Sequence, residues 1–482
     1  MMLINQDSGG SRRKDRISEL PEPLIHLILS FLPTKCVVST SVLSKRWRYI
    51  WTSVPVIDLR EVEFPEYFGL EDSYETDEEL ERVQNLCLSL EQSLMNFVDK
   101  NLSLHYEAQD IKKFYLGTSD KFDLELEKLE EWLSALFTRH NLEEFVFYPN
   151  NSLEEGFFPS SGRYASLVIM ELDTWEPVYL PDAVNFPNLK ICKLSHAYLH
   201  LYSDDPTQQF FSNLRVLEEL ELIECQWDIS DQLLISAPAL KYLLITGPSE
   251  CTDFDDNVPM YVFMMHIFAP NLLSLRYTEV SAKDYILHRF EKLVDVEIDF
   301  EHDNADMPLP QENVAITTKV VKELSNVRRL KVSGETFEEL LFPDNLLTNW
   351  PMFHNLVRLE LTSGISFSKH KTLLNFLRIS PNLKTLVFAQ GFVGQQSSTD
   401  SGWTPDMIPQ CVLLHLKSVK FCEFYGCLED LTAVKTFLKN ARVLKRMIIK
   451  FDSDLSTDEQ NKVMKKLLKF PRGSPRCKIQ VS

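Results

Sequence analysis

A spaced pattern of apolar residues recurs along most of the chain. Each copy follows the template L-x-x-L-x-L, with other apolar residues allowed at the three fixed positions. The alternation at the end of the template is typical of a β-strand with one buried face. Thirteen copies begin at Ile111, Leu142, Leu167, Leu189, Leu217, Leu240, Leu272, Leu293, Val327, Leu356, Leu383, Leu416 and Leu444.

Short turn-forming phrases precede several copies, such as FPNLK at Phe186 and SPNLK at Ser380. Successive copies are 21 to 34 residues apart, around the spacing of about 20 to 29 residues that leucine-rich repeats show. Units of this kind stack one strand beside the last and bury their apolar residues in a shared core. We therefore expect an α/β fold over residues 101–400, an irregular leucine-rich repeat solenoid with a parallel sheet on its concave face.

The segment 15–59 has a different pattern, in which apolar residues follow helical spacing. Pro21 and Pro23 stand in the first turn of the expected helix, where proline is tolerated, and Pro33 ends it. The spacing i, i+3, i+4 and i+7 predicts one apolar stripe, formed by Ile25, Ile28, Leu29 and Leu32.

Two more short helices are expected in the same segment. Thr34 is placed to cap a second helix that runs through Val42 and Leu43, because a threonine hydroxyl can accept a hydrogen bond from the first turn. Ser44 is placed to cap a third helix, which contains Trp47. Three helices this short cannot bury so much apolar and aromatic surface by themselves. Another surface must cover part of it.

The phrases LPEPLIHLILSFLPTK and SVLSKRWRYIW resemble the F-box, the motif by which substrate receptors dock on the Skp-type adaptor of cullin ubiquitin ligases. Cys36 departs from the motif, because an acidic residue often begins the second helix there. The resemblance implies an adaptor-binding face with seven residues: Leu20, Pro21, Ile25, Ile28, Leu32, Leu43 and Trp47.

Two other interpretations of this segment remain open. In the first, the helices form the core of a small helical domain. In the second, they form a helix-turn-helix whose Lys45, Arg46 and Arg48 contact DNA phosphates. The chain has 70 acidic against 50 basic side chains, a formal charge of −20. Nucleic acid and anionic membranes attract cationic surfaces, so we expect neither as a partner.

The remaining segments complete the expected domain organisation. Residues 1–14 are a basic tail, and residues 60–100 are an acidic linker followed by a helix that seals the solenoid. Residues 401–482 resemble the FBD domain of plant F-box proteins, which we expect to cap the solenoid. Within it we expect a helix over 430–440, a helix opened by the capping box of Ser456 and Glu459, and a final strand, CKIQV. The resemblance to FBD is carried by Trp403, Pro405, Pro409, Cys411, His415, Leu416, Lys417, Gly426, Asn440 and Ala441.

The sequence contains no strong candidate for a catalytic site. The sequence has no glycine-rich phosphate loop, no G-x-S-x-G and no H-E-x-x-H motif. Cysteines are scattered without a C-x-x-C pair, which is typical of a reducing compartment. The densest group fits no common zinc spacing and consists of Cys411, His415, Cys422 and Cys427. We expect no catalytic residue, cofactor or metal, no membrane-spanning segment, and a location in the cytoplasm, the nucleus or both.

The expected function follows from the two resemblances. An F-box with a repeat surface implies the non-catalytic receptor subunit of a ubiquitin ligase, which binds a Skp-type adaptor, and through it a cullin, and presents an unknown protein target. The residues between the buried strand positions are candidates for binding that target. We expect the acidic first half of the repeat surface to bind a basic segment of the target, and the end at Arg329 to bind an acidic group. The eight candidates are Glu171, Asp173, Glu219, Glu221, Asp295, Glu297, Arg329 and Lys331.

Two alternatives are a leucine-rich repeat scaffold that engages no ligase and a repeat receptor for a small molecule. Adaptor binding separates the first alternative from a ligase receptor. The second would need a closed pocket with polar anchors, which the uneven repeats do not indicate.

Overall fold

The computed structural model describes most of the chain as two compact units, residues Met1–Met170 and Glu171–Ser482. The predicted basic tail 1–14 and the acidic part of the linker, 61–81, lie outside the described residues. The described residues are 17, 19–60, 82, 85, 89, 92–102, 111–117, 126–139, 141–148, 158, 162, 164–174, 177–179, 186–200, 210–228, 232–247, 264–278, 284–287, 290–300, 311–340, 342, 350–366, 370–393 and 407–481.

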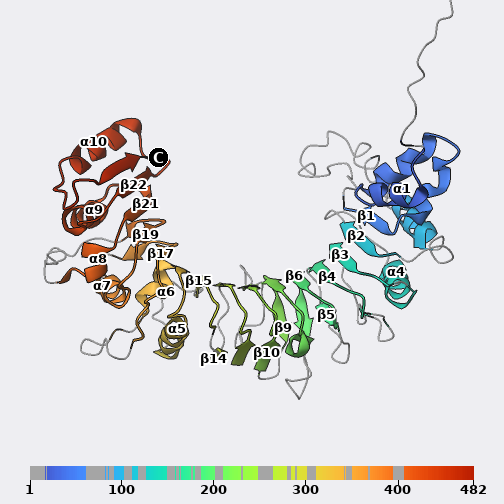
Figure 1. The fold of residues 1–482 in the computed structure, drawn as a ribbon, viewed down its shortest axis with the longest axis horizontal. Helices are drawn as coiled ribbons and strands as arrows, with labels where there is room; N and C mark the ends of the chain where they lie inside the picture. Colours follow the sequence, from blue (N-terminus) through green and yellow to red (C-terminus); the bar gives the residue numbers. More distant parts are fainter. Residues whose placement is uncertain are drawn as a thin grey trace, which may run out of the picture. The chain divides into compact units, whose positions relative to one another are not determined.

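The first unit begins with the predicted helical segment, which folds into short helices and one strand (Figure 1). Its elements are α1 (Glu22–Leu29), α2 (Thr34–Ser39), the 3-10 helices η1 (Thr40–Val42) and η2 (Trp47–Ser53), and β1 (Val56–Leu59). The predicted caps are wrong. Neither α2 nor η2 has a side-chain cap; the Thr34 hydroxyl instead accepts a hydrogen bond from the backbone N–H of Asp58 at 2.7 Å. Thr34 thereby ties α2 to β1, a strand that was not predicted.

Strand β1 is the first of three parallel strands in this unit. It pairs in register with β2 (Lys113–Gly117), which pairs with β3 (Glu144–Tyr148). Helix α4 (Leu126–Arg139) packs against them, with Phe137 and Phe145 rings 5.0 Å apart. Residues 92–102 are helical, in partial agreement with the helix predicted in the linker, and Trp132 of α4 donates a 2.6 Å hydrogen bond to Asp99.

The second unit is built on a parallel sheet whose strands follow one another in chain order. Each strand lies beside the next with the template residues opposite each other, as Leu220 lies opposite Leu243 and Leu222 opposite Ile245. Strand β4 (Ile169–Asp173) contains the division between the units. From there on the strands are β6 (Ile191–Ser195), β8 (Glu219–Ile223), β11 (Tyr242–Thr246), β13 (Ser274–Thr278), β15 (Asp295–Asp299), β16 (Arg329–Val332), β17 (Arg358–Leu361), β19 (Thr385–Phe388), β21 (Ser418–Phe424), β22 (Arg446–Phe451) and β23 (Lys478–Val481).

All thirteen predicted strand positions are therefore confirmed, two of them in β2 and β3. Their template residues are buried because each side chain packs against its equivalent in the next repeat. The parallel sheet and the repeat pattern agree with the predicted solenoid.

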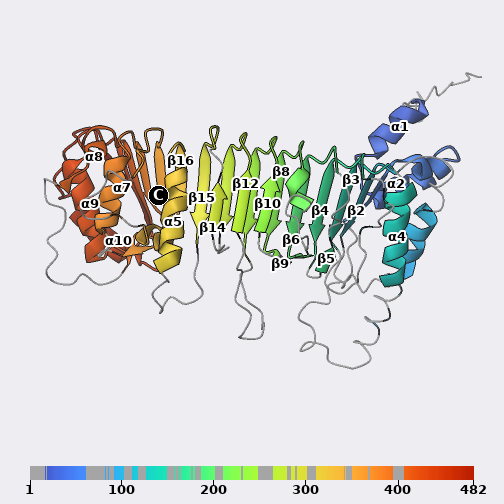
Figure 2. The same ribbon diagram turned by 90° about the horizontal axis from the view of Figure 1, so that it is seen from below.

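The segments that return between the strands lie on one side of this main sheet (Figures 1 and 2). In the middle of the unit they are strands, which form the small parallel sheets β5-β7-β9 and β10-β12-β14. Towards the C-terminus they are helices. The return elements include β5 (Pro177–Tyr179), β7 (Tyr198–His200), η4 (Phe210–Asn213), β9 (Gln226–Asp228), β10 (Gln232–Ser236), β12 (Met264–Phe268), β14 (Asp284–Leu287), α5 (Gln311–Glu323), α6 (Gly334–Glu338), β18 (Ile365–Ser366), α7 (His370–Ile379), β20 (Phe392–Val393) and α8 (Gln410–Leu414).

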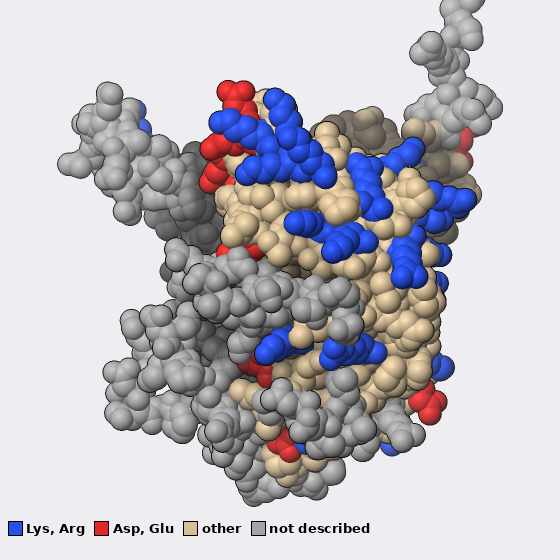
Figure 3. Space-filling model, turned by 90° about the vertical axis from the view of Figure 1, so that its left-hand side faces the viewer, with Lys and Arg blue, Asp and Glu red and all other residues tan. Residues whose placement is uncertain are grey.

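The C-terminal region continues the solenoid. Strands β21, β22 and β23 extend the main sheet, and helices α9 (Leu428–Asn440) and α10 (Thr457–Leu467) pack behind them. The predicted capping box is confirmed, because the Ser456 side chain and Glu459 each bond the other's backbone N–H. Figure 3 views this end of the unit, whose described surface is rich in Lys and Arg. Within the described residues, no helix is both long and apolar enough to cross a membrane.

Candidate protein-docking surfaces

The short N-terminal helices are held by a buried cluster that joins them to the strands of the first unit. Helices α1, α2 and η2 contribute one side, and Val56, Tyr115 and Val146 of β1, β2 and β3 contribute the other. The three strands therefore supply the covering surface that these helices need. The residues from the helical segment are Ile25, Leu29, Val37, Trp47, Ile50 and Val54, with Leu20 and Trp51 at the margin.

The same segment also exposes large apolar side chains. They lie on α1, η1 and η2 and in the turns between these helices, and Phe31 is 79% exposed and Val42 85%. A concentration of exposed apolar side chains in one short segment is typical of a protein-binding site. We call this set the docking face: Leu24, Leu27, Ile28, Phe31, Leu32, Val42, Leu43 and Tyr49.

The structure divides the seven predicted adaptor-binding residues into two groups. Ile28, Leu32 and Leu43 belong to the docking face, Pro21 is exposed, and Leu20 is half-buried. Ile25 and Trp47 are 1% and 5% exposed, because β1, β2 and β3 pack over them. Both lie in the buried cluster and not among the exposed residues of the docking face, and their contact with an adaptor stays a prediction.

Sequence reasoning missed the most exposed members of the docking face. Helix α1 is apolar on two sides, since Ile25 and Leu29 face the core while Leu24 and Leu27 face outward. A search for one amphipathic stripe selects a single side of such a helix. The useful signal was the run of apolar residues in LIHLILSFL, which is too continuous for a helix with only one buried face.

Arg46 connects the two ends of this segment. Its guanidinium donates a 2.8 Å hydrogen bond to the carbonyl oxygen of Leu20, just before α1 begins. Lys45 and Arg48 are exposed, and the Arg48 guanidinium lies 5.5 Å from the centre of the Tyr49 ring. Arg46, one of the three residues considered for phosphate binding, therefore has a structural role here.

The predicted target-binding residues lie on the face of the main sheet opposite the return segments, but they are not free charges. Lys193 of β6 lies 2.8 Å from a Glu219 carboxylate oxygen and 3.2 Å from one of Glu221, both in β8. The hydrogen bond from Lys193 holds the pKa of Glu219 below its ordinary value, whereas burial raises the pKa of Glu221. Lys193 therefore compensates the acidic character expected for this part of the sheet.

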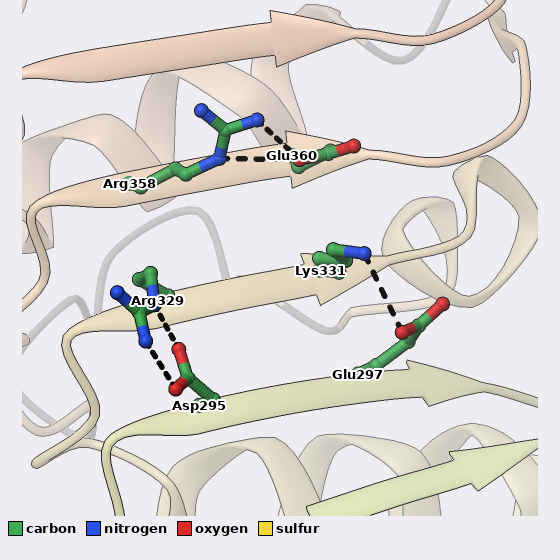
Figure 4. A network of polar contacts seen from close by, with 6 residues as sticks. All are labelled: Asp295, Glu297, Arg329, Lys331, Arg358 and Glu360. Atoms are coloured by element: carbon green, nitrogen blue, oxygen red, sulfur yellow. Dashed lines mark hydrogen bonds and ion pairs between the residues drawn. The ribbon is translucent and has the colours of Figure 1, made fainter. Parts of the chain in front are cut away.

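The same pairing continues through the middle of the unit (Figure 4). Arg329 of β16 forms an ion pair with Asp295 of β15, and Lys331 lies 3.6 Å from the Glu297 carboxylate. Arg358 of β17 pairs within its own strand with Glu360 at 2.7 Å. In the middle of the unit, opposite charges therefore lie next to each other on adjacent strands or within one strand.

Strand β4 carries the remaining two candidates. Glu171 is half-buried, and the Asp173 carboxylate lies 2.7 Å from Nδ1 of His196. His196 adopts a positive φ of 53°, directly after β6, where the chain turns out of the sheet. Asp173 thus helps to hold this turn.

The cysteine and histidine group considered for metal binding has other roles. Cys411 is buried and its thiol donates to the carbonyl oxygen of Leu377, and burial raises the pKa of that thiol to about 12. Nδ1 of His415 lies 2.7 Å from the carbonyl oxygen of Pro381. Among the residues that the structure describes, no group of His, Cys, Asp and Glu is arranged to hold a metal ion.

Comparisons with known proteins match both ends of the chain and its full length. The F-box domain model matches residues 17–58, and the FBD model matches residues 405–449. The Arabidopsis thaliana F-box/FBD/LRR-repeat protein At2g26030 is 27% identical over 96% of this chain and 98% of its own length. The F-box/LRR-repeat protein At4g14096 of the same plant is 28% identical over 98% of this chain and 96% of its own length.

The matched ranges coincide with structural features. The F-box match ends within β1, the strand that anchors the helical segment, and the FBD match covers β21, α9 and the start of β22. The repeats lie between the two matches. The chain therefore carries an F-box domain and an FBD domain, and over nearly its full length it is similar to F-box/FBD/LRR-repeat proteins of Arabidopsis.

Proposed function

We propose that this protein is the substrate-recognition subunit of an SCF-type cullin ubiquitin ligase. Its F-box binds a Skp-type adaptor, and its repeat surface binds a target protein. The observation that carries the proposal is the docking face, a set of exposed apolar side chains on an F-box whose Ile25, Leu29 and Trp47 are packed in a buried cluster. Binding an adaptor removes this surface from water, which is the main favourable contribution to association.

The distribution of apolar residues fits an interface with a few dominant contacts. Phe31 and Leu43 project from a support that the buried cluster fixes in place. Large side chains near the centre of a preformed surface usually carry most of the binding free energy. The docking face therefore needs little rearrangement to bind its partner.

The protein itself is non-catalytic in this proposal. A receptor of this kind brings lysines of a bound target close to a ubiquitin-charged enzyme held elsewhere in the assembly. The gain in rate comes from proximity and orientation, which convert an encounter between two molecules into a reaction within one complex. Within the second unit, the parallel main sheet with its buried template residues is a suitable support for a target-binding surface.

The direct test is co-purification of the full chain with a plant Skp-type adaptor. The double variant Leu27→Asp/Phe31→Asp places two charges in the docking face without touching the buried cluster, so it is expected to lose the adaptor and keep its unfolding temperature. Leu468→Asp is the control for a charge at an exposed leucine, because Leu468 is 58% exposed, close to the 55% of Leu27, but follows α10 in the second unit. Retention of the adaptor by the double variant would contradict the proposal.

Removing the N-terminal residues is a poorer test. A fragment that lacks residues 1–60 also lacks β1 and exposes Tyr115 and Val146, which the F-box helices cover. Loss of the adaptor by this fragment would therefore have two explanations. If the wild-type chain binds no adaptor at all, the proposal fails and the alternative of a non-ligase repeat scaffold stands.

A further inference from the structure

The C-terminal region has a charge opposite to that of the chain. Residues 407–481 contain 15 Lys and Arg against 7 Asp and Glu, whereas the whole chain has 50 against 70. Fourteen of these 15 cations are exposed and Lys420 is half-buried. Figure 3 shows Lys and Arg spread over the described surface of this end of the second unit. Because salt screens charges beyond about 8 Å, a partner at this surface meets a basic region in spite of the acidic total.

Two of these cations, together with Lys384 of the preceding repeat, lie in register along the edge of the main sheet where the strands begin. Lys384, Lys417 and Lys445 occupy the same position in three successive repeats, just before β19, β21 and β22. Backbone hydrogen bonds join them, from Lys417 N–H to the Lys384 carbonyl at 2.8 Å and from Lys445 N–H to the Lys417 carbonyl at 2.9 Å. Adjacent strands are about 4.8 Å apart, so the three side chains start from one row.

Two more cations lie one residue further along the strands, next to this row. Arg446 and Lys478 lie opposite each other as the first residues of β22 and β23. Both are exposed, as are the three lysines of the row. We call these five residues the basic edge: Lys384, Lys417, Lys445, Arg446 and Lys478.

The basic edge is not neutralised as the middle of the sheet is. Arg329 and Lys331 each pair with a carboxylate on the adjacent strand. Within the described part of the chain, none of the five basic-edge cations forms an ion pair with an acidic side chain. The region's nearest acidic residues in sequence, Glu423 and Asp452, lie at the other end of β21 and β22.

Apolar side chains accompany these cations. Leu414 is 46% exposed and lies three residues before Lys417, and Val443 is 36% exposed and lies two residues before Lys445. A phosphate backbone gains nothing from contact with aliphatic groups, whereas a peptide can place its own apolar side chains on them. Tyr425, an exposed aromatic on which a base would stack, follows β21 at the far end of the strand. The surface therefore favours a polypeptide over a nucleic acid.

We propose that the basic edge binds an acidic segment of a partner protein that carries apolar side chains among its carboxylates. The inference deepens the proposed function, because such a segment would be the recognition element of a target. Strands β19, β21, β22 and β23 span about 14 Å at their spacing, and an extended peptide covers about 3.3 Å per residue. About five residues are therefore enough to cross the edge.

The test is a fluorescence anisotropy titration of the full chain with a labelled peptide of about ten residues in which Leu and Phe are interspersed among Asp and Glu. The edge variant Lys417→Glu/Lys445→Glu/Arg446→Glu is expected to bind at least tenfold more weakly, since three attractions become repulsions. The control variant Lys435→Glu/Lys462→Glu/Lys469→Glu makes the same change of charge at exposed residues of α9 and α10 and just after α10. It is expected to bind within about twofold of the wild type, and both variants should keep the wild-type unfolding temperature.

Several outcomes would overturn the inference: no peptide binding by the wild type, wild-type affinity in the edge variant, or equal loss in both variants. An oligonucleotide of equal charge that binds more tightly than the peptide, and is lost in the edge variant, would assign the edge to nucleic acid instead. A peptide with Ser in place of Leu and Phe should bind more weakly, and equal affinity would remove the apolar part of the proposal. Adaptor co-purification with the edge variant should be unchanged, so failure of the ligase proposal is distinguished from failure at this edge.

Discussion

The Arg46 guanidinium donates a 2.8 Å hydrogen bond to the Leu20 carbonyl oxygen, across 26 residues of the F-box. The bond fixes the start of α1 against the segment that contains Trp47 and so sets how α1 presents the docking face.

Removal of this bond is expected to weaken the F-box locally. Arg46→Ala should lower the free energy of unfolding of the first unit by about 1 kcal/mol or less, since the bond is exposed, and reduce adaptor affinity several-fold. Lys45→Ala, a change of equal charge at the adjacent exposed residue, should do neither. Thermal unfolding and adaptor titration of both variants measure the changes in stability and affinity. Equal stability and equal affinity of the two variants would contradict the structural role of Arg46.

Lys193 is expected to make the stability of the second unit depend on pH. The pKa of Glu219 lies below its ordinary value chiefly because Lys193 donates a hydrogen bond to it. The Glu219 carboxylate therefore binds a proton less readily in the folded state than in the unfolded state. It contributes stability above its unfolded pKa, and this stability is lost as pH falls through its folded pKa. Burial raises the pKa of Glu221, so its contribution to stability depends on pH in the opposite direction.

In Lys193→Met the pKa values of both carboxyl groups should rise, because their shared cation is gone. The variant should then lose more stability at neutral pH, where the carboxylates attract Lys193, than at acidic pH, where protonation of the carboxyl groups weakens that attraction. Amide hydrogen exchange of β6 and β8 at the two pH values measures the difference. An equal loss at both would contradict this assignment of charge.

Phe388 and Phe421 connect the repeats to the FBD region. Their rings lie 4.7 Å apart and nearly parallel, with Phe388 in β19 and Phe421 in β21. A double-mutant cycle with Phe388→Leu and Phe421→Leu should give a coupling of about 0.5–1.5 kcal/mol. The same cycle between Phe388→Leu and Leu220→Ala, several strands away, should give a value near zero. Absence of coupling between the two rings, or a separate unfolding transition for residues 407–481, would show that the FBD region is not part of the solenoid core.

The repeats were readable from the sequence because one spacing rule governs both burial and strand position. Leu220, Leu243 and Leu275 occupy the same template position and meet in the same core. The return strand β12 was not readable, because its apolar run has no spacing that separates a strand from a buried helix. The capping of short helices also depends on residues elsewhere in the chain. The Thr34 hydroxyl, for example, accepts a hydrogen bond from β1 and does not cap α2.

The docking and target surfaces were only partly readable, for two physical reasons. Trp47 is covered by strands that contain Tyr115 and Val146, so its burial depends on residues far along the chain. The charges on the main sheet depend on strand register, which brings Arg329 beside Asp295 and cancels both. A sequence shows each charge but not its neighbour on the next strand.

The central claim is that the exposed docking face, and not the buried Trp47, contacts the adaptor. The most direct measurement is an adaptor affinity, with unfolding temperature, for Phe31→Asp and for Trp47→Phe. Phe31→Asp should lose at least about a hundredfold in affinity at an unchanged unfolding temperature, because a charge replaces an exposed anchor. Trp47→Phe should unfold earlier but keep its affinity below that temperature, since it alters only the support. The claim would be contradicted if Phe31→Asp bound the adaptor as tightly as the wild type. It would also be contradicted if folded Trp47→Phe lost much of its adaptor affinity while Phe31→Asp did not.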